Sequence, residues 1–392
     1  MIVHIDTPAE RLIAGPIVQI TGWCASADPS ELGILVLTAG PSILPHDLVD
    51  RPDVRAAYPN DTVLGFSGWL DISRHLDVAA EGRLLIGVRL NGHPVCQLDL
   101  QLAPGVLSLA AAGAKAFEEK RRWCLEHVRC PICGDASRLV SAGPEISCGS
   151  CRTSFPQKAG AINLLTPSLA ETSHLRPTAN VSAHNYDPIA LEIIQSVRTK
   201  GGKVLDCGAG LRSGHDATVV NLEIVDYPTT DVIGVGESLP FKDGSFDAAF
   251  SLAVLEHVAD PFACAKEIAR VLKPGASLYC VVPFLQPEHG YPNHFYNMTR
   301  QGIANLFSGE LIVDRHFVPA SGLPIWGLHS ILTQYRAHLS EPLREKFNNM
   351  TVRDLLANAP VDLLEEELVT ALDEEGNWIL ACTTALIMHK PT

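Results

Sequence analysis

Alternating strand-type and helix-type segments after residue 186 constrain the fold of this chain most strongly. Short apolar runs predict strands at Lys203–Cys207, Thr218–Ile224, Asp247–Leu252 and Ser277–Pro283. A helix is expected between the last two strands, because Asp260–Pro261 is a helix-opening pair and Lys273–Gly275 ends the segment. Parallel strands need crossover connections of this kind, so the order predicts a mostly parallel sheet with helices on its faces.

A glycine turn follows the first of these strands. Val204–Gly210 is a strand that runs directly into a Gly-x-Gly sequence, and Gly208 and Gly210 leave space for a ligand to approach the backbone. The spacing differs from the GxGxxG of dinucleotide-binding folds, because three residues separate the second glycine from Gly214. Asp206 favours a ligand with a cationic amine over a pyrophosphate. An ordinary strand-to-helix turn is the alternative interpretation of this motif taken alone.

Further acidic residues and four short segments follow the glycine turn in a distinctive order. The next strand ends near Glu223 and Asp226, whose carboxylates could accept both hydroxyls of a ribose. The later segments are Glu237–Phe241, Gly244–Asp247, Leu255–Val258 and Arg270–Gly275. This succession resembles the class I S-adenosylmethionine-dependent methyltransferases over residues 186–310. The resemblance implies methyl transfer from S-adenosyl-L-methionine on an α/β Rossmann-like fold, with a mostly parallel seven-stranded sheet whose last strand is antiparallel.

The same resemblance implies that nine positions contact the cofactor: Asp206, Gly208, Gly210, Glu223, Gly236, Glu237, Leu239, Ser251 and Leu252. The first three would follow the methionine part of the cofactor, and Glu223 would bind the ribose. The next three would lie along the adenine, and the last two would lie near the cofactor at the end of the fourth strand. Two departures stand out: Val235 replaces the acidic residue that commonly reads the adenine amine, and the short stretch after Gly210 leaves Asp226 as a rival to Glu223.

The segment Pro283–Thr299, which follows the fifth strand, holds the candidates for catalysis. Loops of the same HxYPxxF type occur in methyltransferases of saccharide and natural-product pathways, which implies a methyl acceptor here. A sugar hydroxyl is protonated at neutral pH and needs a base, for which imidazole is the usual group. His289 is the first candidate for this base and His294 the second, with loop packing as the alternative role of both. His257, beside Glu256, is interpreted as a structural or cofactor-side residue.

Two CxxC pairs precede the α/β region and predict a metal site. The ligands would be Cys130, Cys133, Cys148 and Cys151. Each pair forms a tight turn, and four converging thiolates make a tetrahedral site suited to Zn²⁺. Gly134 and Gly149 are expected to give these turns their backbone freedom. Because four thiolates leave no open coordination position, the predicted zinc is structural. The segment is similar to the small zinc-ribbon activator that is a partner of RNA and protein methyltransferases.

The first 103 residues are predicted to be all-β. A strand is expected at Ile17–Cys24, and a hairpin at Arg83–Leu102 with Asn91–Gly92 as its turn. Three segments resemble the β-sandwich module often attached to bacterial glycosyltransferases and cell-surface polysaccharide enzymes: Gly22–Cys24, Arg51–Pro59 and Gly65–Leu70. This resemblance implies sugar stacking on three aromatic residues, with packing as the alternative: Trp23, Tyr58 and Trp69.

The chain is therefore expected to be multidomain. We predict a β-sandwich accessory domain at residues 1–103, a helical connector at 104–127, a zinc ribbon at 128–170 and a class I methyltransferase domain at 171–392. The last domain is expected to add a strand at Leu311–Phe317, two or more helices, and a final strand at Trp378–Met388.

The net charge and the apolar content of the chain limit the kinds of molecule that it is expected to bind. With 30 Lys+Arg against 44 Asp+Glu, the net charge of −14 disfavours nucleic acid, and the one tight basic cluster, Lys120–Arg122, does not reverse it. Neither a signal peptide nor a membrane span is expected, which favours a cytoplasmic protein with reduced cysteines. The leading hypothesis is O-methylation of a saccharide, a cell-surface glycan precursor or a small molecule. The alternatives are a zinc-ribbon RNA base methyltransferase and a non-catalytic scaffold. The sequence does not decide the oligomeric state, or whether a divalent cation assists the chemistry.

Overall fold

The computed structural model describes the chain except residues 41, 45, 78, 80–81, 138, 143–144, 158–159, 177–181, 291–292, 358–359 and 382–392. The chain divides into two compact units. Residues 1–252 and 266–280 form the first unit, and residues 253–265 and 281–392 form the second.

Two sheets account for residues 2–102. The first has the order β1-β3-β7-β6, and all of its paired strands are antiparallel; its strands are β1 (Ile2–Thr7), β3 (Ile17–Ser26), β6 (His46–Val49) and β7 (Thr62–Asp71). The second has the order β2-β9-β8-β4-β5; its strands are β2 (Leu12–Ile13), β4 (Leu35–Ala39), β5 (Ser42–Leu44), β8 (Arg83–Leu90) and β9 (His93–Leu102). Asn91 and Gly92 have φ angles of 51° and 81° between β8 and β9, so the predicted hairpin turn is confirmed.

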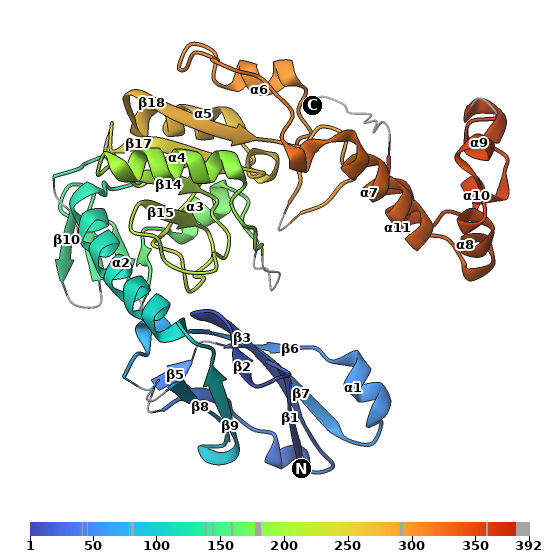
Figure 1. Ribbon diagram of the computed structural model, residues 1–392, viewed down its shortest axis with the longest axis horizontal. Helices are drawn as coiled ribbons and strands as arrows, with labels where there is room; N and C mark the ends of the chain where they lie inside the picture. The colour runs from blue at the N-terminus through green and yellow to red at the C-terminus, as the bar shows by residue number, and fades with distance from the viewer. Residues whose placement is uncertain are drawn as a thin grey trace, which may run out of the picture. The chain divides into compact units, whose positions relative to one another are not determined.

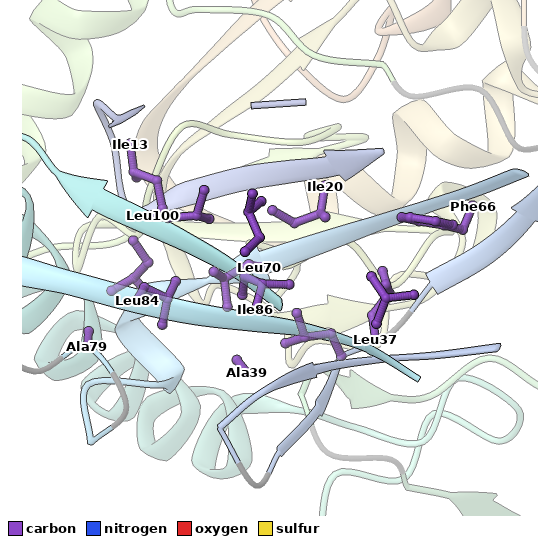
Figure 2. Packing of buried hydrophobic residues seen from close by; sticks show 14 of the residues in the cluster. Ile13, Ile20, Leu37, Ala39, Phe66, Leu70, Ala79, Leu84, Ile86 and Leu100 are labelled. Atoms are coloured by element: carbon purple, nitrogen blue, oxygen red, sulfur yellow. The ribbon is translucent and has the colours of Figure 1, made fainter. Parts of the chain in front are cut away.

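One hydrophobic core lies between these sheets (Figure 2). Ile20 and Leu70 enter it from the first sheet, and Leu37, Ile86 and Leu100 enter it from the second. Each of the five is completely buried. Alternate residues of β8 are buried, as expected for a strand with one face on a core. Trp23 belongs to a separate small cluster, which includes the short helix α1 (Pro52–Ala57).

The predicted connector is the helix α2 (Val106–His127). Its buried positions recur at helical spacing and include Ala110, Gly113, Ala116, Lys120 and Cys124. Lys120 is therefore an interior side chain, so the basic cluster at 120–122 offers even less positive charge to a partner than its sequence indicates.

Three short antiparallel strands follow α2 around the cysteines. They are β10 (Leu139–Ala142), β11 (Glu145–Cys148) and β12 (Ser154–Pro156), in the order β10-β11-β12. The chain then forms β13 (Ile162–Asn163), which joins the main parallel sheet instead of this small one. The segment assigned from sequence to the zinc ribbon thus also supplies a strand to the α/β sheet.

The main sheet has six strands among the described residues, in the order β13-β16-β15-β14-β17-β18. Besides β13, they are β14 (Val204–Cys207), β15 (Val219–Glu223), β16 (Val232–Ile233), β17 (Phe246–Leu252) and β18 (Leu272–Val281). All four pairings between β13 and β17 are parallel, which confirms the mostly parallel sheet. The helix α4 (Pro188–Thr199) lies across one face in front of β14 and β17 (Figure 1), and α5 (Pro261–Val271) follows β17.

The described part of the second unit is helical. It contains α6 (Arg300–Leu306), α7 (Pro324–Ala337), α8 (Glu341–Asn348), α9 (Val352–Leu355), α10 (Glu367–Thr370) and α11 (Glu374–Ile379). A small core there consists of Leu339, Leu343, Leu368 and Leu372. None of the described helices combines the length and the apolar character needed to cross a lipid bilayer.

Two predicted strands are not found where they were expected. Residues 311–317 are neither helix nor strand, and Ile312 is 91% exposed; no strand among the described residues pairs with the backbone of this apolar segment. Trp378 and Ile379 end the helix α11, so the predicted strand does not begin at Trp378. The rest of that prediction, from Cys382 to Met388, lies outside the described residues.

Candidate functional site

The glycine turn after β14 has the geometry that glycine allows. Gly208 and Gly210 have φ angles of 76° and 63°. The amide groups of Gly208 and Ala209 both donate to the carbonyl of Leu222 on β15, at 3.0 and 3.1 Å. A Cβ on Gly210 would lie 2.6 Å from the carbonyl oxygen of Ser182. The turn therefore has no space for a side chain at Gly210.

Asp206 is completely buried at the end of β14, and an arginine pairs with it. Its Oδ2 atom accepts hydrogen bonds from Tyr186 Oη and from Arg212 Nη2, each at 2.6 Å. The Arg212 guanidinium lies over the Tyr186 ring, 4.1 Å from its centre, and burial raises the pKa of Tyr186. Asp206 Oδ1 has no hydrogen-bond partner among the described residues. One carboxylate oxygen is thus fixed, and the other is available to a cationic amine.

Neither Arg212 nor Tyr186 was identified as a site residue from the sequence. Arg212 was noted only as one of the residues that separate Gly210 from Gly214. A buried aspartate before a glycine turn was a signal that a nearby cation should be sought. Tyr186 lies 20 residues before Asp206, and no feature of the sequence indicated that the two side chains would meet.

Glu223 binds the backbone of the glycine turn. Its Oε2 atom accepts from the Gly210 amide at 2.8 Å, and its Oε1 atom accepts from the Ile224 amide at 2.7 Å. Burial raises the pKa of Glu223, while these two amide donors oppose the shift. Asp226, its rival, is exposed. The structure therefore brings Glu223, and not Asp226, to the glycine turn, where a ribose would meet a carboxylate.

The predicted adenine side is a short 3₁₀ turn, Gly236–Ser238, with Val235 and Leu239 buried on either side of it. Glu237, the residue available there in place of an acidic group at Val235, is half-buried. Ser251 is completely buried near the end of β17, and its Oγ atom has no hydrogen-bond partner among the described residues, while Leu252 is half-buried. Such buried polar atoms without partners suit a site that a polar ligand completes.

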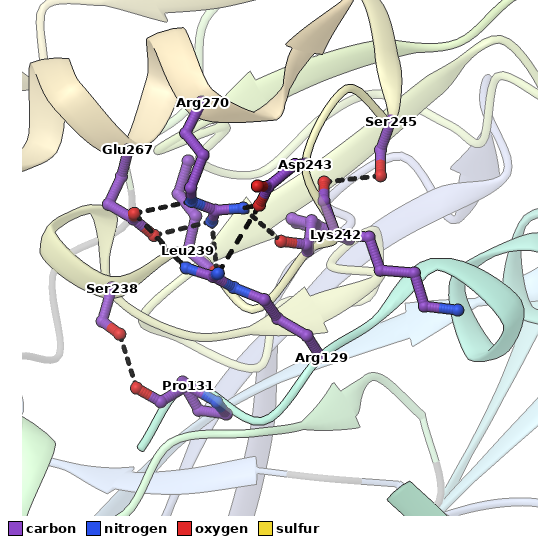
Figure 3. Close-up of polar contacts among 10 residues, drawn as sticks. Arg129, Pro131, Ser238, Leu239, Lys242, Asp243, Ser245, Glu267 and Arg270 are labelled. Atoms are coloured by element: carbon purple, nitrogen blue, oxygen red, sulfur yellow. Dashed lines mark hydrogen bonds and ion pairs between the residues drawn. The ribbon is translucent and has the colours of Figure 1, made fainter. Parts of the chain in front are cut away.

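Polar contacts of two arginines and a serine link the predicted adenine turn, Gly236–Ser238, to the cysteine segment (Figure 3). Arg270 on α5 donates to the Leu239 carbonyl at 3.1 Å and to Asp243 at 2.6 Å. Arg129, next to the first cysteine, pairs with Glu267 at 3.2 Å. Ser238 Oγ donates to the carbonyl of Pro131, which lies between two of the cysteines, at 2.7 Å. The position of the predicted adenine turn thus depends on the cysteine segment.

The four cysteines converge as their spacing predicts. The Sγ atoms of Cys130 and Cys151 are 3.6 Å apart, and those of Cys133 and Cys148 are 3.7 Å apart. Zinc–sulfur bonds of about 2.3 Å in a tetrahedron place neighbouring sulfurs ~3.8 Å apart, so this thiolate set fits Zn²⁺. All four atoms lie within 4.8 Å of one another.

One expectation about the two cysteine turns was wrong. Gly134 has a positive φ of 73°, as predicted, but in the second turn the left-handed residue is Arg152, with φ of 62°, and not Gly149. Each left-handed residue lies four positions after the first cysteine of its pair, and its amide donates to that cysteine's carbonyl at 2.9 Å. The two turns are therefore equivalent, and the geometry requires the positive φ at the fourth position.

Three histidines and a glutamate gather in the second unit. The rings of His289 and His294 are 4.4 Å apart, and His257 lies 5.4 and 5.7 Å from them. The His289 amide donates to His294 Nδ1 at 3.0 Å. Burial lowers the pKa of His257 and of His294, and raises the pKa of Glu256 to about 8. The structure thus joins His257 and Glu256 to the two predicted histidines, which sequence reasoning had kept apart.

Part of the α/β region is similar to known proteins. Residues 211–280 match the family described as Methyltransferase domain. A ubiquinone biosynthesis O-methyltransferase of Xanthomonas campestris pv. campestris (strain B100) is 33% identical over 121 residues, 24% of this chain and 49% of that protein. Cycloartenol-C-24-methyltransferase 1 of Oryza sativa subsp. japonica is 41% identical over 117 residues, 24% of this chain and 34% of that protein.

Among solved structures, an S-adenosylmethionine-dependent methyltransferase of Thermotoga maritima is 26% identical, with a TM-score of 0.18, over 24% of this chain and 51% of that chain. The chain spans about half the length of the first curated relatives it matches. The Xanthomonas and Oryza relatives are, by their names, an O-methyltransferase and a C-24-methyltransferase, so they act on different atoms.

Proposed function

We propose that this chain is an S-adenosyl-L-methionine-dependent methyltransferase that methylates an oxygen atom of its acceptor. The observation that carries the proposal is the glycine turn, with Asp206 at one end and Glu223 bound to its backbone, directly before and within the residues 211–280 that match the methyltransferase family. Asp206 Oδ1 would accept the cofactor's ammonium group, and Glu223 would accept the ribose hydroxyls. Ser251 Oγ, which has no hydrogen-bond partner in the described part of the chain, and the half-buried Glu237 would serve other polar atoms of the same ligand.

When bound, the cofactor supplies an electrophilic methyl group, and the protein's task is to bind and orient the two reactants. Gly208 and Gly210 give the turn after β14 the positive φ angles with which its backbone would border the ligand, and Gly236 and Leu239 belong to the turn that would border the adenine. Leu252 ends β17, beside the buried Ser251. The four cysteines would hold a structural Zn²⁺ that keeps the 129–131 segment against this turn.

For the base that accepts the acceptor's proton, hydrogen bonding favours His289 over His294. His289 Nδ1 lies 2.9 Å from the Pro287 carbonyl, which can only accept, so the proton is on Nδ1 and the Nε2 lone pair is free. His294 Nδ1 instead accepts from the His289 amide, so its own lone pair is already used. We therefore assign His289 as the base and His294 as the residue that fixes the loop.

We propose a saccharide or glycan precursor as the acceptor. The support is the N-terminal region, whose two sheets around one core suit a β-sandwich of the kind attached to glycosyltransferases. Trp69 is half-buried. Trp23 packs on Tyr58 with 5.4 Å between ring centres, so we assign Trp23 to packing within the domain and not to stacking on a sugar. A phenolic hydroxyl is the second candidate, because the Xanthomonas relative is a ubiquinone biosynthesis O-methyltransferase.

A methyl-transfer assay with radiolabelled cofactor tests both the methyltransferase activity and the class of the acceptor. Purified protein is incubated with glycan, phenolic, RNA and protein fractions, and cofactor binding is measured separately by calorimetry. Label in the glycan fraction supports the saccharide acceptor, and label in the phenolic fraction replaces it with the second candidate. Absence of cofactor binding would overturn the methyltransferase proposal and favour a scaffold.

A further inference from the structure

A carboxylate and two imidazoles converge in the second unit without any role in cofactor binding. Glu256 and His257 belong to the 3₁₀ turn Leu255–His257, and His289 belongs to the loop after residue 281. One ligand atom from each of the three lies within 4.8 Å of the other two. Among the described residues, this is the one such group of histidine, cysteine and acidic side chains besides the four cysteines.

Backbone carbonyls fix the tautomers of both imidazoles. His257 Nδ1 lies 2.6 Å from the carbonyl of Asn293, and His289 Nδ1 lies 2.9 Å from the carbonyl of Pro287. Since a carbonyl only accepts, each Nδ1 carries the proton and each Nε2 keeps its lone pair. A histidine that binds a metal commonly donates its other ring N–H to a backbone carbonyl or a carboxylate in this way. Both rings therefore have the arrangement of metal ligands.

Glu256 would be the acidic ligand of such a site. Its side chain is completely buried, and neither carboxylate oxygen has a hydrogen-bond partner among the described residues. Its nearest ion-pair contact in this part of the chain is His257 Nε2, at 3.8 Å. A buried carboxylate normally requires a cation or several donors. The backbone of Glu256 is held by a hydrogen bond from the amide of Phe295 to its carbonyl, at 2.7 Å.

The loop that brings His289 to this place needs a glycine. A Cβ on Gly290 would lie 2.5 Å from His257 Cε1 and 2.7 Å from its Nδ1, and the φ of Gly290 is 129°. His294 stabilises the same loop, because its Nδ1 atom accepts a hydrogen bond from the His289 amide. The proton of the His294 ring is then on Nε2, a buried atom with no hydrogen-bond partner among the described residues. His294 is thus a positioning residue that offers an N–H beside the three ligands.

We propose that Glu256, His257 and His289 bind one divalent transition-metal ion. Two imidazole nitrogens with one carboxylate suit Zn²⁺, Mn²⁺, Fe²⁺ or Co²⁺ better than Mg²⁺ or Ca²⁺, which prefer oxygen ligands. Three protein ligands leave coordination positions open for water or for an oxygen of a ligand. The test of metal binding does not need the proposed methyl transfer, but the site shares His289 with it. With the ion bound, the Nε2 lone pair of His289 would be used by the metal, so the ion would take over the role of the proposed base and favour the ionised form of a bound hydroxyl.

Metal titration of the full chain tests the proposal without an activity assay. The protein is first supplied with one equivalent of Zn²⁺ for the cysteines, and Co²⁺ is then titrated while calorimetry and visible absorption are recorded. A second equivalent is expected, with Co²⁺ bands that lack the sulfur-to-cobalt charge transfer of a thiolate site. Glu256→Gln and His289→Ala are each expected to weaken this second equivalent at least about tenfold, as loss of a ligand does.

His329→Ala is the matched control, because His329 is an exposed histidine on α7 of the same unit. It is expected to leave the second equivalent unchanged. Circular dichroism and the zinc content of the cysteine site verify that each variant is folded, and His289, being exposed, can be replaced without opening a core. The proposal is overturned if no second equivalent binds. It is equally overturned if folded Glu256→Gln and His289→Ala proteins bind Co²⁺ as the wild type does.

Discussion

Lys120 Nζ lies 2.7 Å from Asp231 Oδ2, with both side chains removed from solvent. Lys120 is on the predicted connector helix and Asp231 leads into β16, so this ion pair fastens α2 to the parallel sheet. The same Asp231 oxygen accepts from the amide of Asn221 on β15 at 2.8 Å. A buried charge left without its partner destabilises a protein more than the intact pair stabilises it.

Replacing Lys120 with methionine should therefore lower the free energy of unfolding by about 3–5 kcal/mol, because Asp231 stays buried and unpaired. Urea denaturation followed by circular dichroism measures the change. Arg122→Met is the matched control, since Arg122 is exposed on the same helix and should change stability by less than about 0.5 kcal/mol. Equal stability of the two variants would contradict the structural role of the pair.

Gly210→Ala should weaken cofactor binding by at least about tenfold, because a few kcal/mol of backbone strain and steric conflict arise at the turn. The φ of Gly210 is 63°, and the added Cβ would meet the Ser182 carbonyl. Calorimetry with S-adenosyl-L-methionine measures the affinity. Gly214→Ala is the control in the same loop, because its Cβ would lie 3.5 Å from the nearest atom, Pro16 Cγ, in ordinary contact. A normal affinity of Gly210→Ala would remove the turn from the cofactor site.

Removal of zinc should loosen the predicted adenine turn as well as the cysteine segment. Ser238 donates to Pro131, and Pro131 lies between Cys130 and Cys133, so collapse of the metal site removes one support of that turn. Chelation should release one zinc per chain, and Cys148→Ser should reduce both zinc content and cofactor affinity. Cys96→Ser, at a half-buried cysteine of β9, should change neither. Unchanged cofactor affinity in zinc-free, folded protein would show that the two sites are independent.

Acidification should weaken cofactor binding through Glu223. Burial raises the pKa of Glu223 above its ordinary value, so the carboxylate that would accept the ribose hydroxyls takes up a proton at a higher pH than an exposed glutamate does. Affinity should fall as the pH decreases through this raised pKa. Between the ordinary and the raised value the folded state binds more protons than the unfolded state, so Glu223 lowers stability as the pH increases through that window.

The pH dependence is measured by calorimetry at a series of pH values. Glu223→Gln should bind the cofactor weakly at every pH and should lose the contribution of this group to the profile. If the variant keeps the wild-type pH profile, another group controls binding. Denaturation over the same series should show that Glu223→Gln lacks the decrease of stability with increasing pH.

Local sequence patterns predicted much of the fold. Four of the six described strands of the main sheet, the glycine turn and the β8–β9 hairpin depend on side-chain periodicity and on the positive φ angles of residues such as Gly208 and Asn91, whereas the two-residue strands β13 and β16 were not predicted. The four-cysteine cluster was equally predictable, because two short CxxC turns restrict where four sulfurs can lie. These features depend on interactions between residues near one another in the chain, which the sequence displays directly.

Only the tertiary structure decided which distant side chains meet. Lys120 and Asp231 are 111 residues apart, and nothing near Lys120 distinguishes a buried lysine from an exposed one. The 311–317 segment has a strand-like composition but no described strand beside it, because strands form only where another backbone supplies hydrogen bonds. Taken separately in the sequence, neither Glu256 nor His289 indicates a metal site. Folding brings their ligand atoms and that of His257 within 4.8 Å of one another, since packing, and not spacing along the chain, sets the distances between side chains of separate segments.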